Sequence, residues 1–243
     1  MSIQEIRLKE IRLNYEKLIN NIKTKCLSLD INFDDITIVA ISKTFPASDI
    51  ICLNELGHND IGENKVQELI QKYNDIRDTY PGSVKLKWHL VGHLQTNKVK
   101  YITDIVHLIH SVDSVKLAAE IQKQLTKTET GRDKIINVLI QVNTSREPQK
   151  SGVEIGDTGK LCKEISLFEN IRIKGLMTIG MFTDNENIIR ENFRTLNNLF
   201  QELKSIHTDF KYLSMGMTSD YDIALEEGAN MLRIGSAIFG ERN

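Results

Sequence analysis

A lysine follows a short run of apolar, mostly β-branched residues near the start of the chain. The run covers residues 37–42, and Lys43 stands directly before Thr44, Phe45 and Pro46. Apolar residues at consecutive positions predict a strand that is buried on both faces. Burial at the end of such a strand favours the neutral amine of Lys43, and a neutral amine can form a Schiff base with an aldehyde. The alternative is a side chain that extends past the strand end into solvent and stays charged.

Two small, polar stretches near the C-terminal end of the chain have the composition of phosphate-binding loops. One covers residues 214–219, Ser-Met-Gly-Met-Thr-Ser, and runs into a predicted helix, while Gly235 and Ser236 precede a short turn. Free backbone N–H groups at the start of a helix bind phosphate. Ordinary helix capping is the alternative, and Asp220 would repel a phosphate group.

Arg233 is a charged residue inside a predicted core strand, between Leu232 and Ile234. A buried guanidinium stays charged and must find a hydrogen-bond acceptor. The acceptor is either an atom of a bound ligand or an internal carboxylate such as that of Glu63. In the first case, Arg233 and the two polar stretches would belong to one binding site.

The composition argues against several other functions. Lysine and arginine number 31 against 33 aspartates and glutamates, so the net charge of −2 gives no reason to expect nucleic acid or an anionic membrane as partner. No apolar run is long enough to predict a membrane span, and the N-terminus lacks the layout of a signal peptide. The three cysteines lie far apart, without a Cys-x-x-Cys pair, and a predicted strand separates His89 from His93. We therefore expect reduced thiols, no metal site and a cytoplasmic location.

Apolar segments alternate with helical segments along the chain and must position these residues. Eight strands are predicted, at residues 37–44, 59–64, 87–92, 105–111, 135–142, 171–178, 212–215 and 230–235. Helices are predicted at residues 46–56, 66–73, 94–102, 114–125, 156–168, 186–206 and 219–227, after an extra amphipathic helix at 3–25. Eight such units predict a single (β/α)8 barrel, an α/β domain that spans residues 1–243. A doubly wound open sheet is the alternative, although it would usually carry fewer strands in a domain of this length.

In a (β/α)8 barrel the functional site lies at the C-terminal ends of the strands. This rule turns the strand list into a list of candidate site residues, with His89 near the middle of its strand. The candidates from the successive strands are Lys43, Glu63, Asn64, His89, Asn143, Met177, Thr178, Ser214, Gly216, Met217, Thr218, Arg233, Gly235 and Ser236.

Several segments resemble the pyridoxal phosphate homeostasis proteins, whose barrel is that of the N-terminal domain of alanine racemases, the fold-type III pyridoxal phosphate enzymes. The resembling segments are residues 39–44, 62–68, 88–98, 138–143, 150–152, 175–177, 213–217 and 233–240. They run in the family's order over nearly the whole chain. The resemblance implies that Lys43 holds pyridoxal 5′-phosphate as a Schiff base and that Arg233 faces the pyridine nitrogen. It also implies cofactor contacts from Asn64, His89, Met177, Ser214, Met217, Thr218, Gly235 and Ser236, the phosphate being bound by Ser214, Thr218, Gly235 and Ser236.

The resemblance implies a binding protein that acts in intracellular vitamin B6 homeostasis, without clear catalytic turnover and with no catalytic residue assigned. It would limit the free concentration of the reactive aldehyde, with apoenzymes that use pyridoxal phosphate as candidate recipients. An amino-acid racemase is the alternative, but it needs two positioned bases. In alanine racemases the second base is a tyrosine from a separate C-terminal domain, which we do not expect here because the chain stops at Asn243. Without that domain we expect a monomer. A third candidate is a cofactor-free barrel enzyme that uses Lys43 on a phosphosugar.

Overall fold

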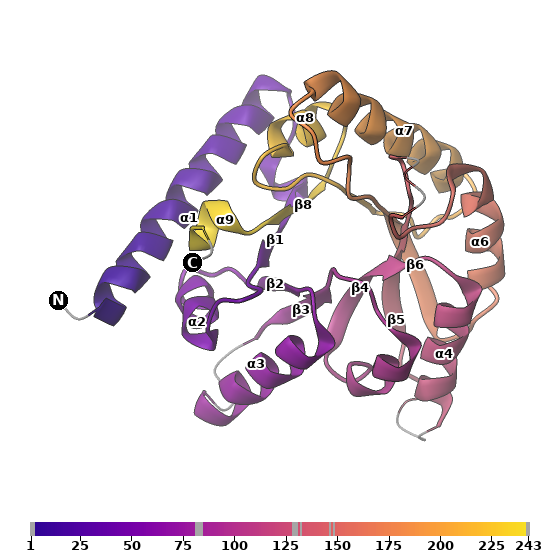
Figure 1. The fold of residues 1–243 in the computed structure, drawn as a ribbon, viewed down its shortest axis with the longest axis horizontal. Helices are drawn as coiled ribbons and strands as arrows, with labels where there is room; N and C mark the ends of the chain where they lie inside the picture. Colours follow the sequence, from indigo (N-terminus) through magenta and orange to yellow (C-terminus); the bar gives the residue numbers. More distant parts are fainter. Residues whose placement is uncertain are drawn as a thin grey trace.

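Eight parallel strands form a closed barrel in which neighbouring strands follow the order of the chain (Figure 1). The structure is a computed structural model that describes residues 3–80, 85–127, 131, 133–145, 147 and 149–241. The strands are β1 (Thr37–Ile41), β2 (Asp60–Glu63), β3 (Lys87–Leu90), β4 (Val106–Val112), β5 (Ile136–Gln141), β6 (Ile171–Met177), β7 (Tyr212–Ser214) and β8 (Met231–Ile234). β8 pairs with β1, with Thr37 opposite Met231 and Ala40 opposite Ile234, which closes the barrel. The predicted (β/α)8 barrel is therefore confirmed, and an open sheet is excluded.

Helices surround the barrel and connect successive strands (Figure 1). The α-helices are α1 (Ile3–Ser28), α2 (Ala47–Glu55), α3 (Val66–Thr79), α4 (Val115–Thr126), α6 (Thr158–Ile165), α7 (Glu186–Lys204), α8 (Tyr221–Glu226) and α9 (Ser236–Phe239); η1 (Phe33–Asp35), η2 (Thr96–Tyr101) and η3 (Ile155–Asp157) are 3₁₀ helices. The predicted extra helix, α1, buries Ile11, Leu18 and Ile22 and packs against α2, α8 and α9. α3 continues to Thr79, past its predicted end at residue 73, because Ile76 extends its buried face. Within the described part of the chain, no helix combines the length and the apolar character needed to cross a membrane.

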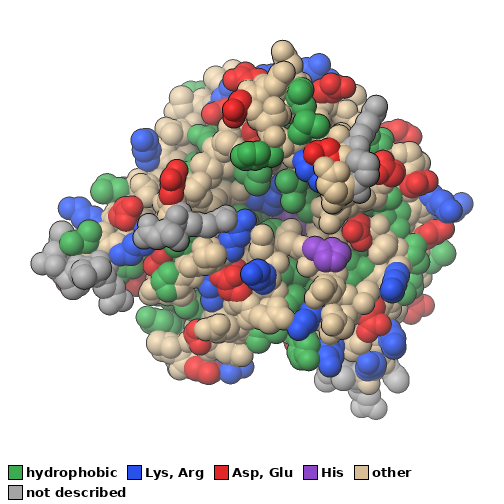
Figure 2. Space-filling model, in the orientation of Figure 1, with side chains coloured by type: hydrophobic (Ala, Val, Ile, Leu, Met, Phe, Trp, Pro, Cys, Tyr) green, Lys and Arg blue, Asp and Glu red, His purple; other side chains and the backbone are tan. Residues whose placement is uncertain are grey.

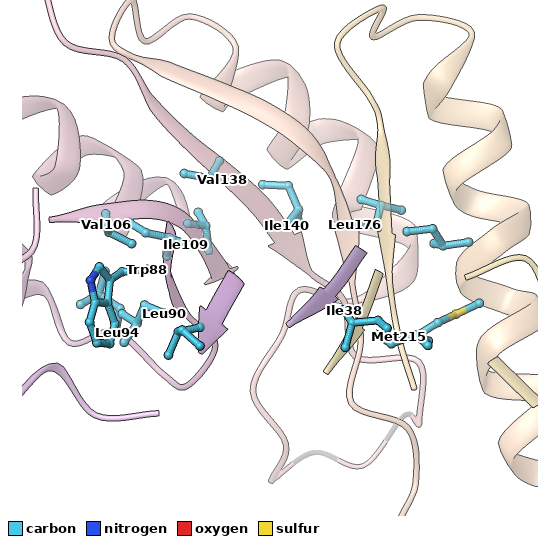
Figure 3. Close-up of a cluster of buried hydrophobic side chains, with 14 of the residues drawn as sticks. Ile38, Trp88, Leu90, Leu94, Val106, Ile109, Val138, Ile140, Leu176 and Met215 are labelled. Atoms are coloured by element: carbon cyan, nitrogen blue, oxygen red, sulfur yellow. The ribbon is translucent and has the colours of Figure 1, made fainter. Parts of the chain in front are cut away.

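The side chains of the strands divide between two cores, because successive side chains point to opposite faces of a sheet. Ile38 and Ala40 belong to the outer core between the sheet and the helices, whereas Val39, Ile41 and Met177 belong to the inner core of the barrel. Figure 3 shows part of the outer core, in which side chains from several strands meet. Both faces of the sheet are therefore covered, which is why β1 is apolar at consecutive positions.

Gly175 marks a close approach between β6 and β7. Its φ is +142°, and a Cβ atom at this position would lie 1.9 Å from the carbonyl oxygen of Tyr212. A side chain here would also require a backbone conformation that residues other than glycine rarely adopt. Glycine at this position therefore allows β6 and β7 to pair where β7 begins.

Candidate functional site

A pocket of about 500 Å³ opens at the C-terminal ends of β1, β2, β7 and β8. The predicted site residues that line it are Lys43, Asn64, Met217, Thr218, Arg233, Gly235 and Ser236. Phe45, Ile179 and Phe182 add apolar surface to its wall, and Phe182 is fully exposed. Figure 2 shows the molecule in the orientation of Figure 1, with hydrophobic side chains beside a hollow near its centre. The barrel thus gathers residues from distant parts of the chain at one end, as the strand-end rule predicts.

The backbone before Lys43 is held by a buried ion pair. Lys72 of α3 donates to the carbonyl oxygen of Ser42 at 2.6 Å and to Glu63 Oε1 at 2.7 Å. The hydroxyl of Ser42 donates to the same carboxylate oxygen at 2.6 Å. Burial raises the pKa of Glu63, and the hydrogen bonds from Lys72 and Ser42 oppose this rise. Glu63 therefore pairs with Lys72 rather than with Arg233, the partner considered from the sequence.

The backbone after Lys43 is held by the same ammonium group through a second carboxylate. Lys72 donates to Glu68 Oε1 at 2.8 Å, and this oxygen also accepts the N–H of Thr44. Thr44 has a φ of +72°, so the chain turns sharply in the left-handed region directly after Lys43. Burial acts to raise the pKa of Glu68, but the hydrogen bonds from Lys72 and Thr44 outweigh it and lower the pKa. This network was not predicted from the sequence, although the Glu68–Lys72 spacing of four on a helix is typical of an ion pair.

Arg233 forms the cationic floor of the pocket. Its side chain is 5% exposed, and it donates to Ser214 Oγ and to the carbonyl oxygen of Thr178, both at 2.8 Å. Burial lowers the pKa of Arg233 to about 10, while the charge of Asp220 opposes this change. The guanidinium therefore stays charged at neutral pH, although both of these acceptors are neutral. It places a hydrogen-bond donor with a positive charge at the base of the pocket.

The two predicted phosphate stretches meet at the edge of the pocket. Thr218 Oγ1 accepts the N–H of Ala237 at 3.3 Å, in the first turn of α9. The backbone N–H of Met217 donates to Asp220 Oδ1, which directs this carboxylate to the backbone. Burial raises the pKa of Asp220, and the hydrogen bond from Met217 opposes the rise. Helix capping, the alternative from the sequence, does not occur at α8, because its N-cap residue Asp220 makes no side-chain cap hydrogen bond. Thr218 instead accepts the N–H from α9 and also lines the pocket.

Three of the residues that the resemblance predicts as cofactor contacts lie deeper in the barrel and are not part of the pocket lining. Ser214 is fully buried and accepts the hydrogen bond from the arginine of the pocket floor. Met177 is fully buried in the inner core. His89 is buried between Asp60, at 3.0 Å, and His110, at 2.9 Å. Of these three residues, Ser214 contacts the pocket lining directly, through its hydrogen bond with Arg233.

Comparisons with known proteins agree with this geometry. The model of the alanine racemase N-terminal domain matches residues 35–243. The pyridoxal phosphate homeostasis protein of Aquifex aeolicus is 41% identical over 206 residues, which cover 84% of this chain and 86% of the relative. The protein of the same name from Haemophilus influenzae is 34% identical over 235 residues, which cover 96% of each chain.

Solved structures extend the comparison to three dimensions. The structure of PipY from Synechococcus elongatus PCC7942 with PLP bound is 30% identical, with a TM-score of 0.76, over 89% of this chain and 99% of that chain. An alanine racemase of Clostridium difficile 630 is 14% identical, with a TM-score of 0.71, over 96% of this chain and 56% of the enzyme, and shows a shared fold alone. The chain therefore belongs to the family of pyridoxal phosphate homeostasis proteins, whose barrel is the alanine racemase N-terminal domain.

Proposed function

We propose that this protein binds pyridoxal 5′-phosphate in the pocket at the C-terminal end of the barrel and holds it as a Schiff base on Lys43. The observation that carries this proposal is the placement of Lys43, Arg233 and the start of α9 around one pocket. A ligand with an aldehyde, a ring nitrogen and a phosphate group needs an amine, a hydrogen-bond donor and backbone N–H groups. The residues present supply this set, and about 500 Å³ is within the range of small-molecule sites. The names of the relatives and the PLP-bound PipY structure support the same ligand.

Each part of the cofactor has a candidate partner in the pocket. Lys43 would bind the aldehyde, and Arg233 would bind the ring nitrogen. The phosphate would be bound by Thr218, Gly235, Ser236 and the N–H groups of α9, and the ring would be lined by Asn64 and Met217. Supporting positions behind these residues are Ser214, Met177 and His89. When bound, the cofactor supplies an electron-withdrawing ring conjugated to the Schiff base. Arg233 can only donate, so it would hold the ring nitrogen unprotonated and thereby weaken the ring as an electron sink.

The pocket supports a carrier function in vitamin B6 homeostasis better than racemisation. A racemase moves a proton between two faces of its substrate and so needs a base on each face. Among the described residues that line the pocket there is no tyrosine, histidine, aspartate or glutamate that could act as a second base beside Lys43. The homeostasis names of the relatives point the same way.

Three further expectations belong to this proposal. Apoenzymes that use pyridoxal phosphate are the proposed recipients of the bound cofactor. A monomer is the proposed working form, which sedimentation analysis of the purified protein would test. Cys26, Cys52 and Cys162 are free thiols, which is in keeping with a reducing compartment such as the cytoplasm.

The visible absorption spectrum of the protein with added pyridoxal 5′-phosphate tests the cofactor and its lysine together. We expect a Schiff-base band in the wild-type protein and in Lys100→Ala, which changes an exposed lysine, but not in Lys43→Ala. Borohydride reduction followed by peptide mass analysis should place the cofactor on Lys43. No band in the wild-type protein, or an equal band in Lys43→Ala, would refute the proposal.

Racemisation assays separate the carrier from the enzyme. Amino acids incubated with the loaded protein should racemise no faster than with Lys43→Ala. Faster racemisation of any one amino acid would favour the racemase alternative.

A further inference from the structure

Polar side chains form a continuous line through the interior of the barrel. Asp60 Oδ1 lies 3.0 Å from His89 Nε2, and His89 Nδ1 lies 2.9 Å from His110 Nε2. His110 Nδ1 lies 3.4 Å from Ser214 Oγ, which accepts the 2.8 Å hydrogen bond from Arg233. His89, His110, Ser214 and Arg233 are all buried, so water does not compete for these contacts.

The two ends of this line lie at opposite ends of the barrel. Arg233 faces the pocket at the C-terminal ends of the strands. Asp60 is the first residue of β2 and lines a second pocket, of about 240 Å³, with Lys87 and Tyr212, the first residues of β3 and β7. The side chain of Asp60 is 20% exposed, and Lys87 Nζ lies 3.5 Å from its other oxygen. The line thus connects the floor of the candidate cofactor site with the opposite face of the protein.

Hydrogen-bond chemistry gives the line a single direction. A guanidinium group can only donate, so Ser214 Oγ accepts from Arg233 and keeps its own proton to donate to His110 Nδ1. His110 then carries its ring proton on Nε2 and donates to His89 Nδ1, and His89 donates from Nε2 to the Asp60 carboxylate. In the reverse direction a neutral His89 would turn a lone pair toward that carboxylate, which is repulsive.

This direction requires both rings to be neutral. Burial lowers the pKa of His89, although Asp60 opposes the change. Burial, with the neighbouring His89 and Arg233, lowers the pKa of His110 well below its ordinary value. The charges of Arg233 and Asp60 therefore stand at the two ends of a chain of neutral, aligned dipoles.

We propose that Asp60, His89 and His110 are positioning residues that act through Ser214 to hold Arg233 in its orientation toward the cofactor pocket. Asp60 selects the tautomer of His89, His89 selects that of His110, and His110 directs the Ser214 hydroxyl so that its oxygen faces the guanidinium. A carboxylate that orients a histidine by accepting a hydrogen bond from its ring N–H is a common device in functional sites. The orientation of Arg233 is inferred from contacts within the protein. The effect of this orientation on the affinity for pyridoxal phosphate rests on the proposed function.

The ring tautomers of the unliganded wild-type protein provide the first test, and they need no variant. In ¹⁵N NMR spectra at neutral pH, we expect His89 and His110 both to be neutral and both to carry the proton on Nε2. A proton on Nδ1 of His110, or a charged His89 ring, would overturn the proposed direction.

A pair of variants at Asp60 provides the second test. Asp60→Ala removes the acceptor, whereas Asp60→Asn retains an amide oxygen that can accept from His89. Asp209→Ala is the matched control, because Asp209 pairs with Lys174 at 3.2 Å and is not part of the line. Outer-shell partners of metal ligands are worth about ten- to a hundredfold in affinity, and we take the lower end for Asp60 because it acts on Arg233 through His89, His110 and Ser214. We therefore expect Asp60→Ala to mix the His110 tautomers, shift the Arg233 side-chain resonances and weaken pyridoxal 5′-phosphate binding about tenfold.

Asp60→Asn should restore the Nε2–H tautomers and most of the affinity, and Asp209→Ala should match the wild-type protein in every readout. Unchanged tautomers in Asp60→Ala, or changed tautomers with unchanged cofactor affinity, would overturn the positioning role. If the wild-type protein does not bind the cofactor at all, the proposed function fails, and the tautomers and the Arg233 resonances still decide whether Asp60 orders the line.

Discussion

Lys72 is the cation that joins the backbone on both sides of Lys43, and Lys72→Met should therefore destabilise the protein strongly. Methionine has a similar length but carries no charge and no N–H donors. The substitution leaves the fully buried Glu63 carboxylate and the Ser42 carbonyl oxygen without the ammonium group. Glu63 Oε2 already has no hydrogen-bond partner, so this carboxylate has little means of compensation.

The structure sets the size of the expected loss. Removing one partner of a buried ion pair typically costs about 3–5 kcal/mol. The second pair, with Glu68, is partly exposed and adds at most about 1 kcal/mol. We therefore expect Lys72→Met to lower the free energy of unfolding by about 3–5 kcal/mol at neutral pH, a large share of the roughly 5–15 kcal/mol typical of a domain.

The loss should also depend on pH in a defined direction. Burial raises the pKa of Glu63, and the hydrogen bond from Lys72 opposes the rise, so removing Lys72 raises the pKa further. A carboxyl group with a raised pKa in the folded state destabilises the fold when it ionises, that is, as the pH rises above the value of about 4.5 that it has in the unfolded chain. The deficit of Lys72→Met should therefore be largest at neutral pH and should shrink under mildly acidic conditions.

Urea denaturation at neutral and mildly acidic pH measures these effects. The double variant Glu63→Gln/Lys72→Met keeps an acceptor for Ser42 without a charge, and it should recover a large part of the lost free energy. Arg77→Met is the control on the same helix, because Arg77 is exposed and pairs with its neighbour Asp78, so it should cost less than about 0.5 kcal/mol. A Lys72→Met loss as small as that of Arg77→Met, or a loss that Glu63→Gln does not reduce, would refute this account of the buried pair.

Three further substitutions test other parts of the structure. Thr44 has a φ of +72°, so Thr44→Gly should stabilise the protein by about 1 kcal/mol in urea titrations, and a loss of stability would contradict backbone strain at this position. Gly175→Ala should lower the free energy of unfolding by about 3 kcal/mol or more, or prevent folding, because its Cβ would lie 1.9 Å from the Tyr212 carbonyl oxygen. A variant that melts at the same temperature as the wild-type protein would contradict this close approach. Burial lowers the pKa of His89 and of His110, so the unfolded chain binds more protons and the free energy of unfolding should fall as the pH drops below about 6.5. His110→Gln should flatten this fall, and an equally steep profile would show that His110 does not contribute.

The barrel and about half of the residues that line the pocket could be predicted from the sequence alone. β1 is apolar at consecutive positions because Ile38 and Val39 face different cores, and this pattern depends only on the alternation of side chains across a strand. Once eight strand–helix units are counted, the strand-end rule places Lys43 and Arg233 at one end of the barrel, and both line the same pocket. Patterns of neighbouring residues were sufficient for these two predictions, because the alternation of side chains and the direction of each strand follow from local backbone geometry.

The pairing of the buried polar groups depends on the three-dimensional fold. Glu63 has Lys72 as its partner instead of Arg233, and Ser214 binds Arg233 from beneath the pocket instead of lining it. His110 lies 104 positions from Ser214 along the chain, so no spacing rule could join them. A buried polar group must be satisfied by whichever partner the folded chain brings within about 3 Å, and that partner is set by the packing of whole elements. Sequence patterns therefore reveal which residues lie inside the barrel, whereas the three-dimensional fold decides which of them bind one another.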